Sequence, residues 1–213
     1  MRIAVIGAGT DAGKMIVSEA EKKGIQVVSV VEDPSVMPGS GPVVIKDFRT
    51  LERGDLDGVH AVVDAVSFPG ISRYSSDDLP LWHLGSILSG TDSSMLVLGA
   101  TSCLYSDSSR KSLVLDDCCY TQIDNEQTLR LCANAVKRLR AEHTFKWTLL
   151  CPPLVLDTVG YATGKFVFGD DVLPMSVDGS SYICLADFAK ASVDLLIRGL
   201  KPSSVISVRS EKK

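Results

Sequence analysis

A glycine-rich turn close to the N-terminus holds residues whose types and spacing suit the binding of a dinucleotide. Residues 2–6 form an apolar run, residues 7–13 read Gly-Ala-Gly-Thr-Asp-Ala-Gly, and a helical pattern follows. A helix N-terminus has unpaired backbone N–H groups and a partial positive charge, so it binds a pyrophosphate. In such a turn Gly7 permits the tight bend, Gly9 lets phosphates approach, and the small Ala12 lets the helix pack on the strand. The alternative is a tight turn that binds nothing. We predict that the turn residues bind a cofactor, and these are Gly7, Ala8, Gly9, Thr10, Asp11, Ala12 and Gly13.

An acidic residue follows the second predicted strand at the spacing that dinucleotide sites use. Residues 26–31 are apolar and lead into Glu32 and Asp33, about 20 residues after the glycine turn. A carboxylate there accepts hydrogen bonds from a ribose 2′-hydroxyl and would repel a 2′-phosphate. We therefore predict that Glu32 binds the cofactor and that NAD(H) is preferred over NADP(H). The alternative is that Glu32 points to solvent.

Strand and helix patterns alternate along the chain, which indicates how these residues are positioned. Apolar runs typical of buried parallel strands lie at residues 2–6, 26–31, 43–46, 60–66, 94–99 and 147–151, and a last strand at 204–208. Helical patterns lie at residues 12–23, 77–89, 123–142 and 186–199. The alternation predicts an α/β fold with a doubly wound parallel sheet, the NAD(P)-binding Rossmann fold. We expect one domain over residues 1–213, in which residues 154–185 form a small C-terminal substrate lobe over the site.

Ligands of such sheets bind beyond the carboxyl ends of the strands, so the residues after each predicted strand are the remaining site candidates. The plain alternative for each aromatic residue and proline is loop packing. As further cofactor-binding residues we predict Asp47, Phe48, Ser67, Phe68, Gly99, Ala100 and Pro152. As residues that bind a substrate we predict Phe68, Pro69, Leu104, Tyr105, Pro153 and Leu154.

Composition sets limits on the partners. The chain has 213 residues, of which 45% are hydrophobic, and a net charge of −4, so it can fill a core and carries no basic patch that would suit nucleic acid. The most basic segment, residues 137–140, falls late in a helical pattern and indicates a solvated helix face.

No run has the length of a membrane span and no secretion signal is recognisable, so we expect a cytoplasmic protein with free thiols. A redox role for the adjacent Cys118 and Cys119 stays open, no metal-ligand spacing is present, and a homodimer is a reasonable expectation.

Several blocks of sequence, in this order and spacing, resemble an atypical short-chain dehydrogenase/reductase. The blocks are residues 1–9, 96–105 (Leu-Val-Leu-Gly-Ala-Thr-Ser-Cys-Leu-Tyr), 147–154 (Trp-Thr-Leu-Leu-Cys-Pro-Pro-Leu), 163–166 and 182–189. They are most similar to the small single-domain proteins described as proposed NADH-flavin reductases, a group related to NmrA-like proteins and biliverdin reductase B. Two departures stand out. The turn of that group usually reads G-A-T-G-x-x-G, so Gly9 and Thr10 look exchanged, and Glu32 follows the second strand where relatives often carry an arginine.

The chain lacks the Tyr-x-x-x-Lys pair with which a typical short-chain dehydrogenase moves a proton. Tyr105 is followed four positions on by Ser109, and Tyr120 by Asp124. This disfavours alcohol–ketone redox and sugar epimerisation, and it suits hydride transfer from NAD(P)H to a flavin such as FMN or FAD or to another planar acceptor, because solvent can then supply the proton. We predict Ser102 and Tyr105 as the catalytic residues, with turn capping as the alternative role of Ser102.

Two other functions remain open from the sequence. One is a non-catalytic NAD(P)-binding sensor or regulator of the NmrA-like type, and the other is an isomerase or dehydratase that holds NAD permanently. The start of the last helical pattern holds Asp187, which we expect to cap that helix.

Overall fold

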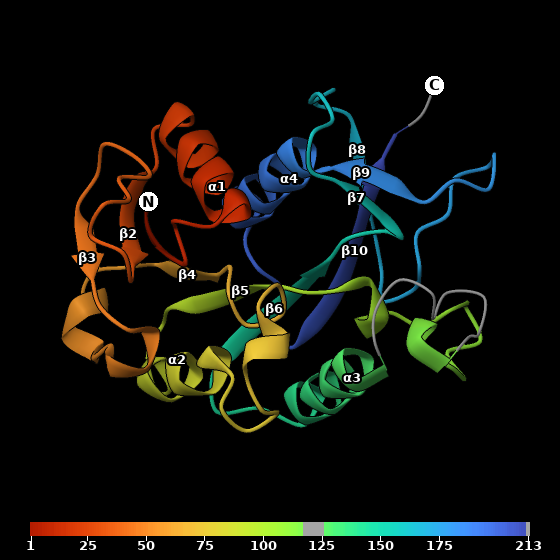
Figure 1. The fold of residues 1–213 in the computed structure, drawn as a ribbon, viewed down its shortest axis with the longest axis horizontal. Helices are drawn as coiled ribbons and strands as arrows, with labels where there is room; N and C mark the ends of the chain where they lie inside the picture. The colour runs from red at the N-terminus through yellow and green to blue at the C-terminus, as the bar shows by residue number, and fades with distance from the viewer. Residues whose placement is uncertain (117–125, 212–213) are drawn as a thin grey trace.

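The computed structural model describes residues 1–116 and 126–211, and within them an eight-stranded sheet divides the molecule into two helical layers (Figure 1). The strand order is β3-β2-β1-β4-β5-β6-β10-β8. All neighbouring pairs are parallel except β8, which runs antiparallel to β10. The strands are β1 (Arg2–Ile6), β2 (Gln26–Val31), β3 (Val43–Ile45), β4 (Ala61–Asp64), β5 (Ser94–Leu98), β6 (Lys146–Cys151), β8 (Phe166–Gly169) and β10 (Ser204–Ser210).

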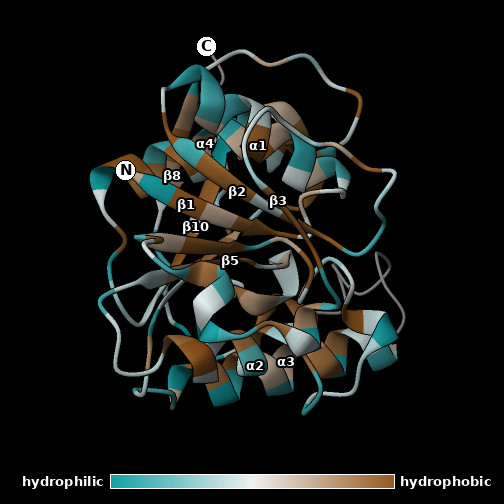
Figure 2. Cartoon of the chain, turned by 90° about the vertical axis from the view of Figure 1, so that its left-hand side faces the viewer, coloured by the Kyte–Doolittle hydropathy of each residue, from teal (hydrophilic) through white to brown (hydrophobic). Residues whose placement is uncertain are grey.

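Two helices cover each face of the sheet. Helices α1 (Asp11–Lys22) and α4 (Leu185–Arg198) pack together on one face, and α2 (Pro80–Leu88) and α3 (Glu126–Arg140) lie on the other (Figure 1). Figure 2 shows the apolar strands enclosed between the two layers. Each face has its own cluster of buried side chains, Ile16 and Phe188 in one and Leu84 and Leu139 in the other. Strands that are buried on both faces need continuous apolar runs, which is why the sequence shows so few alternating strands.

The predicted doubly wound α/β sheet is confirmed, together with its first six strands, its last strand and its four helices. From β1 the chain adds β2 and β3 on one side and β4, β5 and β6 on the other, so the strand order reverses between β1 and β4. In such sheets a ligand crevice lies at this point, at the carboxyl ends of the strands. The sequence did not indicate β7 (Val155–Asp157), β8 or β9 (Tyr182–Cys184). β7 and β9 form a separate two-stranded parallel sheet, whereas β8 joins the edge of the main sheet. That residues 154–185 act as a lobe over a substrate stays a prediction.

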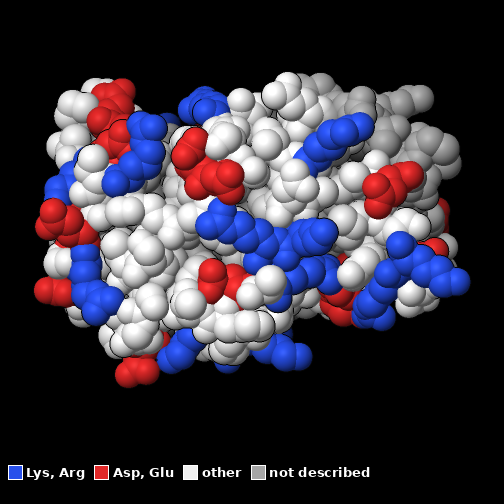
Figure 3. Space-filling view, turned by 90° about the horizontal axis from the view of Figure 1, so that it is seen from below, with Lys and Arg blue, Asp and Glu red and all other residues white. Residues whose placement is uncertain are grey.

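The basic segment at the end of α3 lies on the face of the molecule that carries α2 and α3. Lys and Arg side chains gather in the middle of this face, with Asp and Glu side chains around them (Figure 3). Arg138 donates a hydrogen bond of 2.9 Å to Asp77, and its guanidinium carbon lies 4.0 Å from the centre of the Trp82 ring. These contacts tie α3 to the segment that precedes α2 and to α2 itself.

The cysteines of the described part of the chain are free, as expected. Cys103, Cys132, Cys151 and Cys184 are all buried, and Cys118 and Cys119 lie outside the described residues. Within residues 1–116 and 126–211, no helix combines the length and apolar character that a membrane span needs. In the same residues, no group of three or more His, Cys, Asp or Glu side chains could hold a metal ion.

Candidate functional site

The glycine-rich turn joins β1 to α1 and leaves backbone amides at the helix start. Gly7 has a φ of +76°, which favours glycine. Thr10 is the N-cap of α1, because its hydroxyl accepts a 3.0 Å hydrogen bond from the amide of Gly13 and donates one of 2.8 Å to the carbonyl of Gly7. The amides of Asp11 and Ala12 precede the first intrahelical hydrogen bond and have no acceptor among the described residues. The exchange of Gly9 and Thr10 relative to the usual turn therefore supplies a helix cap.

Two of the turn glycines are required by close packing. A Cβ at Gly13 would overlap the carbonyl oxygen of Gly7 and would lie 2.8 Å from the Cα of Ala8. A Cβ at Gly7 would overlap the side chain of Val66 in the loop after β4. The backbone of the turn therefore lies directly against the helix and the neighbouring loop, which leaves the space in front of the turn open.

A cavity of about 480 Å³ opens at this turn, and we call it the glycine-turn cavity. It lies at the carboxyl ends of β1, β2, β4 and β5, where the strand order reverses. Residues from the first turn of α4 also line it, together with Leu156 of β7. Of the predicted site residues it brings together Gly7, Gly9, Thr10, Asp11, Ala12, Glu32, Phe48, Pro69 and Gly99.

The charged residues of the glycine-turn cavity are mostly acidic. Asp11, Glu32, Asp33 and Arg73 line it. Glu32 is exposed and has no hydrogen-bond partner among the described residues, whereas Asp33 accepts hydrogen bonds of 2.8 and 2.7 Å from the amide and hydroxyl of Ser35, which hold its pKa below the usual value. Glu32 is thus the carboxylate of this pair that is available to a ligand.

Arg73 and Tyr74 line the same cavity and were not predicted from the sequence. They lie in the segment between β4 and α2, at the end of the 3-10 helix Ile71–Arg73, and the guanidinium of Arg73 has no hydrogen-bond or ion-pair partner among the described residues. Burial, and next the negative charge of Glu32, raise the pKa of the Tyr74 phenol. The signal that could have found them is their place a few residues beyond a strand at the point where the sheet order reverses.

Asp64 at the end of β4 was also missed. Its side chain is fully buried, and one carboxylate oxygen accepts hydrogen bonds of 3.0 Å from the amides of both Val66 and Ser67, while the other oxygen has no partner among the described residues. Burial raises its pKa. The carboxyl group shapes the loop that packs against Gly7.

Several predicted cofactor residues do not line the glycine-turn cavity. Asp47 accepts three hydrogen bonds of 2.6 to 2.9 Å from the side chain and amide of Arg49, which lower its pKa to about 2, and it caps the short 3-10 helix Phe48–Thr50. The buried hydroxyl of Ser67 accepts a 2.9 Å hydrogen bond from the amide of Leu81 in α2. Ala8 is fully buried. These residues support the elements that form the site and do not line it.

A second cavity of about 400 Å³ adjoins the first, and we call it the acceptor-side cavity. Pro69, Gly99 and Leu156 line both cavities, so the two spaces meet there. Ser102 lines the acceptor-side cavity, is buried, and its hydroxyl has no hydrogen-bond partner among the described residues. Of the predicted residues this cavity brings together Phe68, Pro69, Gly99, Ala100, Ser102, Pro152 and Leu154.

Three residues predicted to contact a substrate line neither cavity. Leu104 is fully buried in the core beneath α3. The carbonyl of Pro153 accepts a 2.7 Å hydrogen bond from the hydroxyl of Thr101. The hydroxyl of Tyr105 lies 2.9 Å from Arg140, whose guanidinium carbon is 4.6 Å from the centre of the Tyr105 ring.

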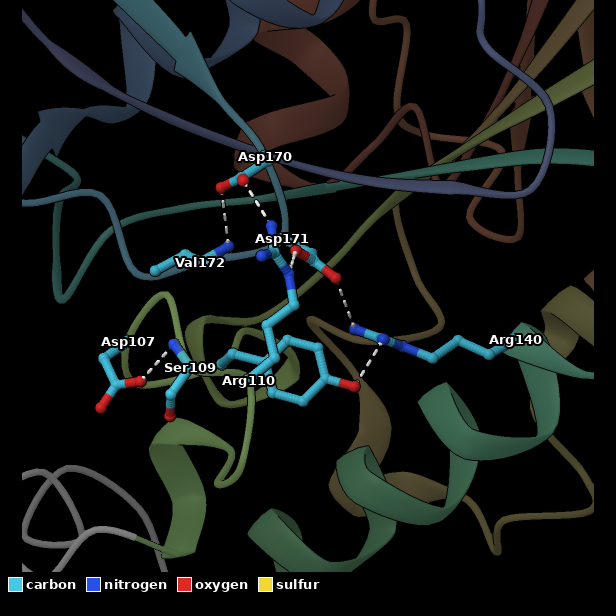
Figure 4. Close-up of polar contacts among 8 residues, drawn as sticks. Asp107, Ser109, Arg110, Arg140, Asp170, Asp171 and Val172 are labelled. Atoms are coloured by element: carbon cyan, nitrogen blue, oxygen red, sulfur yellow. Dashed lines mark hydrogen bonds and ion pairs between the residues drawn. The ribbon is translucent and has the colours of Figure 1, made fainter.

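Arg140 belongs to a polar network that explains the position of Tyr105. Figure 4 shows Arg140 extending from α3 towards Asp171, and Arg110 lying between Asp170 and Asp171. The distances are 3.5 Å from Arg140 to Asp171, 2.8 Å from Arg110 to Asp171 and 2.5 Å from Arg110 to Asp170. Tyr105 thus links α3 to the segment after β8, and its geometry gives no support to a catalytic role.

The fold and the site define an NAD(P)-binding Rossmann architecture, and comparisons with known proteins agree. A solved structure from Streptococcus pneumoniae TIGR4, described as a proposed NADH-flavin reductase, is 27% identical, covers 99% of this chain and 100% of its own, and superposes with a TM-score of 0.87. A protein of Lactobacillus casei is 29% identical over 100% of both chains, with a TM-score of 0.86.

Among curated proteins the chain is similar to the uncharacterised protein YwnB of Bacillus subtilis (strain 168), with 27% identity over 200 residues and 92% of each chain covered. No protein-family model matches the chain. The structural likenesses confirm the predicted resemblance to the atypical short-chain dehydrogenase/reductase group.

Proposed function

We propose that this chain is an NAD(P)H-dependent oxidoreductase that binds NAD(H) in the glycine-turn cavity and reduces a planar acceptor, a flavin or a quinone, in the acceptor-side cavity. The observation that carries the proposal is that two cavities of about 480 and 400 Å³ share the wall formed by Pro69, Gly99 and Leu156. Hydride transfer between stacked rings requires positioning of the two rings more than acid–base groups. The similarity to a protein described as a proposed NADH-flavin reductase also supports this proposal.

The residues of the glycine-turn cavity fit a dinucleotide. The free amides of Asp11 and Ala12 at the N-terminus of α1 would hold the pyrophosphate. Glu32 would accept hydrogen bonds from the ribose, and Phe48 offers an apolar surface to the adenine. When bound, NADH supplies one hydride and becomes NAD⁺, and the acceptor takes that hydride and one proton from water to become its dihydro form.

The residues of the acceptor-side cavity would orient the second ring. Phe68, Pro69 and Pro152 would give it apolar walls, and Gly99 and Ala100 also line the cavity. Ser102 lines this cavity and would donate a hydrogen bond to a carbonyl of the acceptor or of the nicotinamide amide. No tyrosine or lysine lines this cavity among residues 1–116 and 126–211, which accords with a proton taken from solvent.

Turnover separates this function from the alternative of a non-catalytic NAD(P)-binding sensor. We expect the purified chain to oxidise NADH, followed by absorbance, with at least one of riboflavin, FMN, FAD and a simple quinone. We expect Ser102→Ala to lower kcat/KM for the acceptor about fivefold, the effect of one lost hydrogen bond. Ser86→Ala, which removes an exposed hydroxyl on α2, is the control. Tight NADH binding without oxidation by any acceptor would favour the sensor.

We further propose that NAD(H) is preferred over NADP(H), because Glu32 would repel a 2′-phosphate. Wild-type protein should bind NADH more tightly than NADPH in a fluorescence titration, and Glu32→Gln should narrow the ratio of the two dissociation constants about tenfold, or ~1.4 kcal/mol. The control is Asp33→Asn, which removes the same charge at the next residue, where the carboxylate is already bound by Ser35. It should change the ratio of the two dissociation constants less than Glu32→Gln does. Tighter binding of NADPH by the wild type would contradict the proposal.

A cytoplasmic location, a homodimer and the lack of nucleic-acid partners stay predictions.

A further inference from the structure

We propose that the acceptor-side cavity selects acceptors without a charged group, so that riboflavin or a neutral quinone is reduced in preference to FMN or FAD. This inference rests on the proposed function and names the substrate class of the same site. Its basis is the chemistry of the cavity wall, which consists of apolar side chains and hydroxyl groups.

The wall offers no counter-charge to a phosphate or a sulfonate. Of the described residues that line the acceptor-side cavity, none is Lys, Arg, His, Asp or Glu. The loss of water from an anion without a compensating partner is costly. An anionic acceptor therefore gains nothing at this wall that would offset its desolvation.

Three arginines on and near α3 belong to contacts away from the cavity wall. Arg110 and Arg140 lie beside Asp170 and Asp171, and Arg138 is bound to Asp77. Arg73 lines the glycine-turn cavity and not the acceptor-side cavity.

Charged residues of both signs follow wall residues in the sequence. Asp116 follows Leu115, Arg73 follows Ser72 and Arg130 follows Leu129, and none of the three charged residues lines the acceptor-side cavity. The described wall itself therefore has no charged contact for a phosphate.

The uncharged groups of the wall suit a ring that carries carbonyl groups. Ser102 is a buried residue that lines the cavity, and its hydroxyl has no partner among the described residues, so this hydroxyl is available to a carbonyl group of a ligand. The hydroxyl of Thr101 is already used by Pro153. Flavin ring systems and quinones both present carbonyl groups on a flat, apolar body, and the wall does not distinguish between them.

Two matched pairs of acceptors test the inference. Riboflavin and FMN differ by one phosphate, and 1,4-naphthoquinone and its 2-sulfonate differ by one sulfonate. With NADH at saturation, we measure kcat/KM for both members of whichever pair supports turnover. We expect the uncharged member to have a kcat/KM about tenfold higher, because a tenfold ratio requires only a small part of the free energy that desolvation of a phosphate costs. The pair that supports turnover identifies the ring system as a flavin or a quinone.

A variant that supplies the missing cation provides a second arm. Ser72 is exposed and lines the acceptor-side cavity. Ser72→Arg should raise kcat/KM for FMN relative to riboflavin about fivefold, in a manner that high salt suppresses, whereas the neutral control Ser72→Gln should leave the ratio unchanged.

The outcomes separate the two proposals. Equal or faster reduction of FMN and of the sulfonate would overturn the selection of uncharged acceptors and leave the oxidoreductase function standing. The absence of turnover with every acceptor would contradict the oxidoreductase function itself. In that case the dissociation constants of riboflavin and FMN, measured by quenching of flavin fluorescence, decide the selectivity: tighter riboflavin binding supports it, and equal or tighter FMN binding overturns it.

Discussion

Replacement of Gly13 by alanine should abolish tight NADH binding and lower the free energy of unfolding by ~3 kcal/mol, the upper range for an overpacked site. The added Cβ would overlap the carbonyl oxygen of Gly7 and would lie 2.8 Å from the Cα of Ala8. Both neighbours are backbone atoms, so the turn must shift as a whole. The shift would also disturb the 3.0 Å hydrogen bond by which Thr10 caps the helix.

Urea unfolding and an NADH titration measure the two effects separately. The matched control is Gly54→Ala, since a Cβ at Gly54 meets no atom within 4 Å, and it should leave both quantities unchanged. If Gly13→Ala has the wild-type free energy of unfolding and also the wild-type affinity for NADH, the glycine turn does not form the cofactor site. If it is stable but fails to bind, the turn acts on the ligand directly.

The sheet and its helices could be predicted because their signals are local. An apolar run and the helical pattern that follows it are read from neighbouring residues, and the observed β1, α1 and β2 agree with the prediction within a residue or so. The position of Glu32 beside the turn follows from the same short unit. By contrast, β7 and β9 have three residues each and pair across a separation of more than twenty residues. No local sequence pattern therefore predicts these two strands.

The site residues divide in the same way. The sequence places Asp47 and Ser67 directly after strands, where a ligand-binding side chain would stand, but each one instead accepts hydrogen bonds from backbone amides of a following helical turn. A short polar side chain at a strand end suits both roles, and the choice depends on how the next helix is placed. The position of Tyr105 away from both cavities has a related cause, since its partner Arg140 lies 35 residues further on.

Asp187 illustrates how a non-local contact can replace an expected local one. The sequence predicts that it caps α4, and this is wrong, because the N-cap is Cys184, whose sulfur accepts from the Asp187 amide at 3.4 Å. The buried Asp187 carboxylate instead accepts hydrogen bonds of 2.8, 2.7 and 2.8 Å from the amide and hydroxyl of Thr163 and the amide of Gly164. It fastens the segment before β8 to the start of α4.

Asp187→Ala should therefore lower the free energy of unfolding by ~3 kcal/mol, because buried donors to an ionised group would lose their partner. Urea unfolding at neutral pH measures the loss. Asp194→Ala on the same helix, which removes an exposed ion pair of 3.1 Å with Arg198, should cost under ~0.5 kcal/mol. A loss at Asp187 no larger than that of the control would contradict the anchoring role.

The pH dependence gives this prediction a sign. Burial alone would raise the pKa of Asp187, but the hydrogen bonds from Thr163 and Gly164 outweigh it, so the folded-state pKa lies below the usual value. The stabilisation is then complete above the unfolded pKa of about 3.9 and is lost as the pH falls through the lower folded pKa. The stability difference between wild type and Asp187→Asn should accordingly be constant near neutral pH and shrink only in acid. A difference that grows as the pH falls would show that the carboxylate is not held in its ionised form.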